Sequence, residues 1–184
     1  MLILGIIFNL HSLWALMRLV DAIQALKNIS RTGWMQHGLR IAESVAEHSF
    51  ESALLALELA SAAGMDAEKA AVLALVHDVP EAIMGDMPKW SSERVRRIDE
   101  EAMREIKSDK IGELFREFEE GRSNEAKIAR LCDLLATNIQ ARRYMKQGYD
   151  MTEIEEKTRR EIAEMLEDDV FRPIRGRVLE LMQV

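Results

Sequence analysis

Only three prolines and nine glycines occur in the 184 residues of the chain. Proline removes a backbone donor and glycine costs conformational entropy, so a chain poor in both can form long uninterrupted helices. Hydrophobic residues make up 48% of the chain and charged residues 31%, which is ordinary for a globular protein. We therefore predict an all-α fold, and the length is enough for one domain with a sizeable core.

Apolar residues recur at helical spacing over residues 10–27, which predicts a first helix there. Residues 30–42 lack this period and are predicted to form a loop. Ser44 and Glu47 then match a capping box, which predicts a helix from Ser44 to Gly64. Later helices are expected at about 92–107, 110–120, 123–147, 151–168 and 174–182.

A helix is also expected to begin at Asp66, a residue type that favours the N-terminal cap. By i, i+3, i+4 spacing it carries His77, Asp78 and Glu81 on one side. Pro80 removes an amide donor near its end, so we expect the backbone to kink or restart there. This expected break lies next to His77, Asp78 and Glu81.

Charge and cysteine content limit the partners and the compartment. The formal net charge of −7 argues against nucleic acid as the main partner, because such binding draws on clustered Lys and Arg. The single cysteine, Cys132, excludes an internal disulfide and fits a reducing compartment such as the cytoplasm. The apolar start of the chain is interrupted by Asn9, His11 and Ser12, so we expect an amphipathic helix rather than a membrane span or signal peptide.

Several polar residues fall on faces that are otherwise apolar. Asp133 lies among leucines in a predicted helix, and burying an unpaired carboxylate costs several kcal/mol, so it should face a cation or strong donors. His48, His77 and Asp78 come from two other predicted helices. Imidazoles and carboxylates together suit a divalent metal ion. Spacing alone leaves two interpretations open, a metal site or unrelated caps and core hydrogen bonds.

Three stretches and Asp133 carry a family resemblance. The stretches are residues 31–34 (RTGW), residues 43–49 (ESVAEHS) and residues 75–86, which begin LVHD. They resemble the HD-domain phosphohydrolases, an all-helical superfamily, and within it the branch of the 5′-deoxynucleotidases. The resemblance covers roughly residues 10–150. It implies a single HD-domain helical bundle over 1–184, in which C-terminal helices of 151–184 pack on the core.

The resemblance also implies roles for individual residues. One divalent metal ion, for which Co, Mn, Mg, Zn, Ni and Fe are all candidates, would be held by His48, His77, Asp78 and Asp133. Glu81 would orient or deprotonate a water on the metal. It follows His77 by four residues, which places it one helical turn along on the same face. Its alternative is a solvated surface glutamate.

Three further residues would act on the substrate. Asp86 resembles the second catalytic carboxylate of the family, with a turn-capping aspartate as the alternative. Arg31 would clamp the phosphate, because a guanidinium offers a fork of donors to phosphate oxygens. Trp34 would pack against the sugar or base, which in this branch helps to select deoxyribose. His37 and Arg40 are expected to lie exposed on the surface.

The implied reaction is hydrolysis of a nucleoside 5′-monophosphate to nucleoside and phosphate. Two alternatives remain: hydrolysis of another phosphate ester, such as a cyclic dinucleotide or an alarmone, and a metal- or nucleotide-binding regulatory module without turnover. Because the family often forms dimers, we also expect a homodimer.

Overall fold

The computed structural model describes residues 18–86 and 101–183. Within these ranges every extended element of regular structure is a helix, and the sole β-type pairing there is an isolated bridge between Ser30 and Ser44. The predicted all-α class is confirmed. Residues 10–17 and 92–100, which belong to two of the predicted helices, lie outside the described part of the chain.

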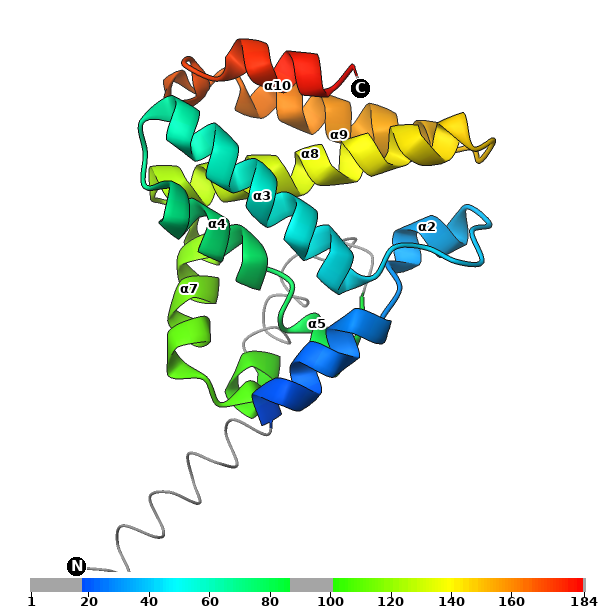
Figure 1. Ribbon diagram of the computed structural model, residues 1–184, viewed down its shortest axis with the longest axis vertical. Helices are drawn as coiled ribbons and strands as arrows, with labels where there is room; N and C mark the ends of the chain where they lie inside the picture. The colour runs from blue at the N-terminus through cyan, green and yellow to red at the C-terminus, as the bar shows by residue number, and fades with distance from the viewer. Residues whose placement is uncertain (1–17, 87–100, 184) are drawn as a thin grey trace, which may run out of the picture.

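The described helices follow the chain as shown in Figure 1. Residues 18–28 and 101–106 are helical. The labelled elements are α2 (Thr32–Gln36), α3 (Val45–Ala63), α4 (Ala67–Val76), α5 (Glu81–Met84), α7 (Asp109–Glu120), α8 (Asn124–Lys146), α9 (Thr152–Met165), the 3₁₀ turn η1 (Asp169–Phe171) and α10 (Arg175–Leu181).

Side-chain caps fix where the long helices begin. The Ser44 hydroxyl accepts a hydrogen bond from the Glu47 amide, and the Glu47 carboxylate accepts one from the Ser44 amide, so the predicted capping box forms. Ser123 caps α8 through the Ala126 amide. These local bonds satisfy amide donors that have no partner inside the helix. They also fix where in each helix the later site residues fall.

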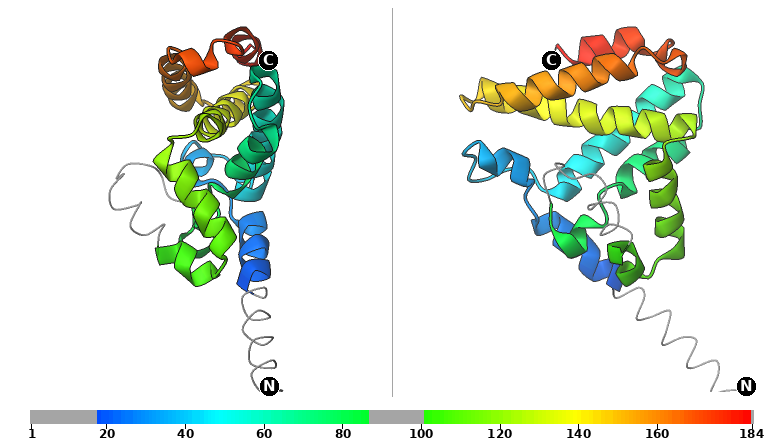
Figure 2. Two further views of the ribbon diagram at one scale, coloured as in Figure 1. Left: turned by 90° about the vertical axis from the view of Figure 1, so that its left-hand side faces the viewer. Right: turned by 180° about the vertical axis from the view of Figure 1, so that it is seen from behind.

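The core lies where α3, α4 and α8 pack together, with α9 and α10 along the far side of α8 (Figures 1 and 2). α3 and α4 form a hairpin of adjacent helices, and α8 crosses both. Fully buried apolar side chains from these helices, among them Leu73, Leu131, Leu135, Ile162 and Ile174, form one continuous cluster. Burial of such side chains supplies the main stabilisation. It places the polar residues of α3, α4 and α8 around a shared interior.

Two details differ from the predictions. The predicted loop contains helix α2, whose five residues are too short to show an amphipathic period. Helix α9 ends at Met165, three residues before the predicted end at Asp168, because Asp168 caps the 3₁₀ turn η1 by accepting from the Val170 amide. Among the described helices, none combines the length and the apolar character that a membrane crossing needs.

Candidate active site

Four polar side chains from three separate elements meet inside the helical core. His48 comes from the first turn of α3, His77 and Asp78 from the turn that follows α4, and Asp133 from the middle of α8. All four are buried, and His48 is completely shielded from solvent. The fold therefore brings together the whole set that the sequence assigned to a metal ion.

Short distances join the imidazoles to the carboxylates. His48 Nε2 lies 3.0 Å from Asp133 Oδ1 and 3.9 Å from Asp78 Oδ2. His77 Nε2 lies 3.1 Å from Asp78 Oδ2 and 3.5 Å from Asp133 Oδ1. Candidate ligand atoms of His48, His77 and Asp133 all fall within 4.8 Å of one another. The two Nε2 atoms thus face the same pair of carboxylates.

A backbone contact fixes the orientation of His77. Its Nδ1 lies 2.7 Å from the Ala74 carbonyl oxygen, which can only accept, so Nδ1 carries the proton. The Nε2 atom is buried and has no hydrogen-bond partner among the described residues, although it faces two carboxylates. The Nδ1 atom thus bonds a carbonyl while Nε2 points into a carboxylate cluster. This arrangement is typical of a histidine that binds a metal ion.

Electrostatics also favours a cation in this cluster. Burial lowers the pKa of His77, but the charges of Asp78 and Asp133 outweigh it and raise that pKa to about 10. The cluster therefore stabilises positive charge between its carboxylates. Burial, assisted by Arg31, lowers the pKa of His48 to about 4, so this imidazole is neutral at pH 7 and able to ligate. The residues present fit a divalent metal ion.

Arg31 lies beside the cluster, just before α2. Its Nη1 donates to Asp78 Oδ2 at 3.0 Å, and its Nε lies 3.9 Å from Glu43 Oε1. Burial lowers the pKa of Arg31, yet Asp78, Asp133 and the other nearby carboxylates raise it overall, so the guanidinium stays charged. Burial raises the pKa of Asp78, but His77 and then Arg31 outweigh it and hold the pKa of that carboxyl below its usual range.

Asp86 anchors helix α2 from a distant part of the chain. Its carboxylate accepts hydrogen bonds from the Thr32 amide and, at 2.7 Å, from the Thr32 hydroxyl. The Thr32 hydroxyl also lies 3.1 Å from the Asp86 carbonyl oxygen. Asp86 therefore binds the first amide of α2. The turn-capping alternative stated from the sequence involves residues 87 and 88, which lie outside the described part of the chain, and it stays a prediction.

Glu81 begins α5, directly after Pro80, where the backbone restarts as predicted. α4 ends at Val76, so His77 and Asp78 lie in the turn between the two helices rather than within one helix. Burial, with the charges of Asp78 and Asp86, raises the pKa of Glu81 to about 10. Its Oε2 is buried without a hydrogen-bond partner among the described residues. The solvated-surface alternative for Glu81 does not fit this environment.

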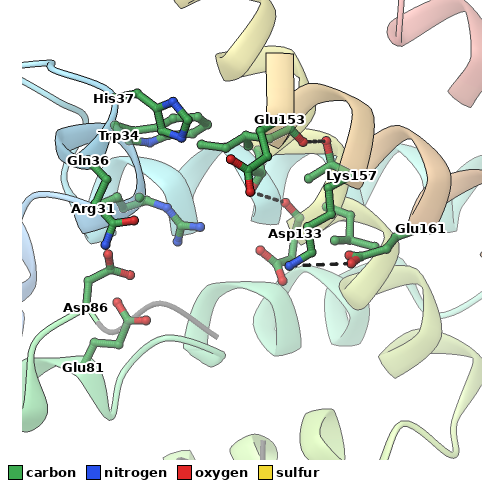
Figure 3. Close-up of a pocket in the computed structure, with 15 residues that line it drawn as sticks. Arg31, Trp34, Gln36, His37, Glu81, Asp86, Asp133, Glu153, Lys157 and Glu161 are labelled. Atoms are coloured by element: carbon green, nitrogen blue, oxygen red, sulfur yellow. Dashed lines mark hydrogen bonds and ion pairs between the residues drawn. The ribbon is translucent and has the colours of Figure 1, made fainter. Parts of the chain in front are cut away.

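A cavity of about 260 Å³ lies against the cluster, and Figure 3 shows its lining. Arg31, Trp34, Glu81, Asp86 and Asp133 all line it. Asp133 belongs both to the buried cluster and to the cavity wall, so a bound molecule would reach the cluster from this cavity. Its size is near the lower end of ordinary small-ligand pockets.

The opposite wall of the cavity was not predicted from the sequence. Glu153, Lys157 and Glu161 of α9 face Arg31 and Asp86 across it (Figure 3). Their four-residue spacing places them on one helix face, but such charges also mark an ordinary solvated face, so the pattern alone did not single them out. His37 also lines the cavity, whereas Arg40 is exposed as expected.

Comparison with known proteins identifies the family. A family model described as "HD domain" matches residues 23–172. The chain belongs to the HD domain family. This HD-domain protein is 31% identical to "5'-deoxynucleotidase HDDC2" of Dictyostelium discoideum over 143 residues, which are 68% of this chain and 75% of that protein. It is 30% identical to the Homo sapiens protein of the same name over 147 residues, 74% of this chain and 72% of that one.

Solved structures agree with this HD-domain assignment. A conserved hypothetical protein from Pyrococcus furiosus superposes with a TM-score of 0.79 at 28% sequence identity, covering 90% of this chain and 98% of that one. The family and the fold predicted from the sequence are thus confirmed. The domain bounds and the roles of individual site residues stay predictions.

Proposed function

We propose that this HD-domain protein hydrolyses deoxynucleoside 5′-monophosphates to nucleoside and phosphate, using one divalent metal ion held by His48, His77, Asp78 and Asp133. The observation that carries the proposal is the position of Asp133, which joins the buried histidine–aspartate cluster to a cavity that also contains Arg31 and Glu81. The relatives named 5'-deoxynucleotidase, at about 30% identity, support the substrate class.

When bound, the metal ion would supply a Lewis acid that polarises the phosphoryl group and makes water more acidic. Arg31 provides the second positive charge, aimed into the cavity from the wall opposite α9 (Figure 3). Phosphoryl transfer depends mostly on positioning and on neutralising charge at the non-bridging oxygens. Arg31 would therefore hold the phosphate, while its bond to Asp78 keeps the guanidinium beside the metal ligands.

Glu81 is the residue we assign to proton transfer. Its raised pKa reflects burial next to Asp78 and Asp86. With a metal ion at Asp78 the pKa of Glu81 would fall, and Glu81 would take the carboxylate form that a general base requires. Asp86 would assist protonation of the leaving sugar oxygen or orient the water, in addition to anchoring Thr32. Trp34 would contact the sugar, since it lines the same cavity.

Phosphate release by the purified protein tests the proposal. Deoxynucleoside and nucleoside 5′-monophosphates, a cyclic dinucleotide and a guanosine alarmone are each supplied with Mn²⁺ or Co²⁺. We expect release from the deoxynucleotides. Hydrolysis of the cyclic dinucleotide or the alarmone alone would favour the other phosphohydrolase function. If metal is bound but no compound releases phosphate, the proposal is overturned. The binding module without turnover would then be the remaining alternative.

The variant Glu81→Gln sharpens this test. It preserves shape but cannot accept a proton, so we expect activity to fall about 10²–10⁴-fold, the usual range for loss of a general base. Metal content should be unchanged, because Glu81 is not among the proposed ligands. Glu113→Gln, on an exposed site of α7, is the matched control and should leave activity intact. Full activity of Glu81→Gln would remove Glu81 from the mechanism.

We further propose a homodimer in the cytoplasm. Apolar side chains that stand exposed on the described surface support self-association, among them Val20, Ile23, Phe50 and Leu54. The single cysteine, buried and unpaired, supports a reducing compartment. Light scattering at several protein concentrations tests the first part, and a constant monomer mass would contradict it. Cell fractionation tests the second.

A further inference from the structure

Glu43 occupies the junction between α2 and α3, next to the cavity. Three hydrogen bonds tie it to both sides of the site. Its carbonyl accepts from the Arg31 amide at 3.0 Å, its carboxylate accepts from Trp34 Nε1 at 2.9 Å, and its own amide donates to the Tyr144 hydroxyl at 3.0 Å. Only 9% of its side chain is exposed. The backbone of Glu43 is thus held at two points, and its buried carboxylate is held by the bond to Trp34.

The contact with Trp34 fixes the indole ring. Trp34 is almost fully buried, yet it contributes to the cavity wall. The ring of Tyr144 packs against it edge-on, with centroids 5.3 Å apart. Packing alone allows the ring to shift, whereas a charge-assisted bond at Nε1 sets its orientation. Glu43 and Tyr144 together hold the indole from two directions.

The same carboxylate oxygen, Oε1, also lies 3.9 Å from Arg31 Nε. Asp78 takes the other edge of the guanidinium, through Nη1 at 3.0 Å. Arg31 is thus held between one carboxylate of the metal cluster and one carboxylate bonded to Trp34. The hydrogen bond at Nη1 and the carboxylate charge near Nε act on different sides of the planar guanidinium, so its direction into the cavity depends on both acids.

We propose that Glu43 is a positioning residue that holds Trp34 and Arg31 in one fixed relation, so that the sugar and the phosphate of one substrate are recognised together. This inference rests on the proposed function for the identity of the substrate. Glu43 itself does not line the cavity. It acts through the two side chains that do.

The electrostatic setting of Glu43 agrees with this role and determines how it must be tested. Burial raises its pKa to about 7, and Glu51 and Glu47 of α3 add to that effect, while Arg31 and the Trp34 indole oppose it. Tyr144, from α8, contacts its backbone. At about pH 8 Glu43 is mainly charged, so assays at that pH compare a carboxylate with its neutral replacements.

Two variants separate the two contacts. Glu43→Gln keeps an oxygen that can accept from Trp34 Nε1 but loses the charge that faces Arg31. We expect KM for 2′-deoxyadenosine 5′-monophosphate to rise about tenfold, the size of one charge-assisted contact, with kcat changed less than about threefold. Glu43→Leu loses both contacts. It should also lower the preference for the deoxynucleotide over adenosine 5′-monophosphate, at least about fivefold.

A double-mutant cycle with Trp34→Phe tests the link to the indole. Without the Nε1 donor, Glu43→Gln and Glu43→Leu should show the same sugar preference, because the bond that distinguishes them is gone. Glu51→Gln is the matched control. It removes a half-buried acid of α3 that pairs with Arg143, and it should change neither KM nor preference. Thermal unfolding of each variant verifies that it is folded.

Calorimetry can measure the same effects without turnover. Each Glu43 variant is combined with Glu81→Gln, and the binding of both nucleotides is measured. Loss of affinity there supports the role of Glu43 even if the wild type releases no phosphate, so the two proposals can fail separately. Should Glu43→Leu fail to fold, the rise in KM of Glu43→Gln relative to Glu51→Gln still decides. If Glu43→Gln behaves like Glu51→Gln, or if Glu43→Leu leaves the preference unchanged, the proposal is overturned.

Discussion

Asp133 connects interior and surface at the scale of the single residue. It pairs with His48 at 3.0 Å inside the core and forms part of the cavity wall. A leucine at this position would pack as well as its neighbours, but it would remove the carboxylate that lies 3.0 Å from His48 Nε2 and 3.5 Å from His77 Nε2. The proposed metal ion would account for a carboxylate at this buried position.

Replacement of Asp133 by alanine should abolish metal binding and activity. Loss of an outer-shell partner usually costs about 10–100-fold in metal affinity, so loss of a direct ligand should exceed about 100-fold. Metal content after gel filtration, measured by atomic emission, checks this. Asp150→Asn, at an exposed turn, is the control. Full metal occupancy in Asp133→Ala would show that the ligand assignment is wrong.

Glu43 predicts a pH dependence of stability. Its folded-state pKa of about 7 lies above the ordinary value of 4.5, so the folded state binds its proton more tightly than the unfolded state. The resulting stabilisation is fully present below about pH 4.5 and is lost as pH rises through 7. The stability difference between wild type and Glu43→Gln should therefore change by about 3 kcal/mol across this window, to the disadvantage of the wild type at high pH.

Urea unfolding at several pH values measures that difference. Taking wild type minus variant cancels the titration of groups that both proteins share. A difference that stays constant from pH 4.5 to 8 would show that Glu43 keeps its ordinary pKa in the folded protein.

At the scale of the element, the break between α4 and α5 separates the proposed metal ligands from the proposed general base. His77 and Asp78 lie in the buried turn before Pro80, and Glu81 lies after it, beside the cavity. Gly85 then ends α5 with φ 76° and ψ 164°, a conformation that side chains with Cβ strongly disfavour. This turn delivers Asp86 to Thr32.

Gly85→Ala should therefore destabilise the protein by about 1–3 kcal/mol, the cost of a strained backbone position. Among the described residues, apart from the chain neighbours of Gly85, no atom lies within 4 Å of the added Cβ, so we expect the effect to come from the backbone. Activity should also fall, because Asp86 is displaced from α2. Gly112→Ala, inside α7 with an open surrounding, is the control and should stabilise by about 0.5–1 kcal/mol. Equal effects of the two substitutions on the urea midpoint would contradict this account.

The sequence was sufficient for the elements whose signals are local. Ser44 and Ser123 begin α3 and α8 as predicted, because a cap and its helix are neighbours in the chain. Helix α2 was missed because its N-terminal amide is bound by Asp86, 54 residues further on. No pattern within a short window reports such a bond.

The residues of the candidate site also divide into those that could be predicted from the sequence and those that could not. The metal cluster was predicted from residue types and from family resemblance, and the fold brings all four residues together. The α9 wall with Lys157 was not predicted, because its charges resemble those of any solvated helix. Glu43 was visible only as part of a motif, since its partners Trp34 and Tyr144 are 9 and 101 residues away.

At the scale of the whole molecule, the site joins helices that are distant in sequence. The proposed ligands come from α3, the turn after α4, and α8, which are also the helices that share the main core. A metal ion bound to all of them favours the folded state over the unfolded state by mass action.

We expect Mn²⁺ at about 100 times its dissociation constant to stabilise the protein by about 2.7 kcal/mol. For a chain of this length that corresponds to a rise in Tm of about 5–10 °C. Differential scanning calorimetry, with and without a chelator, measures the shift. Asp133→Ala should show almost none of it. An equal rise in that variant would mean that the ion acts elsewhere on the protein.

The bonds of Arg31 to Asp78 and of Thr32 to Asp86 have a consequence for turnover. They attach the start of α2 to the turn after α4 and to the residue that follows the end of α5, before any substrate arrives. This side of the pocket is therefore preorganised, and little binding energy is spent on assembling it. Substrates should then be discriminated by how well they match a ready-made shape, and the rate of encounter should not depend on prior rearrangement of α2.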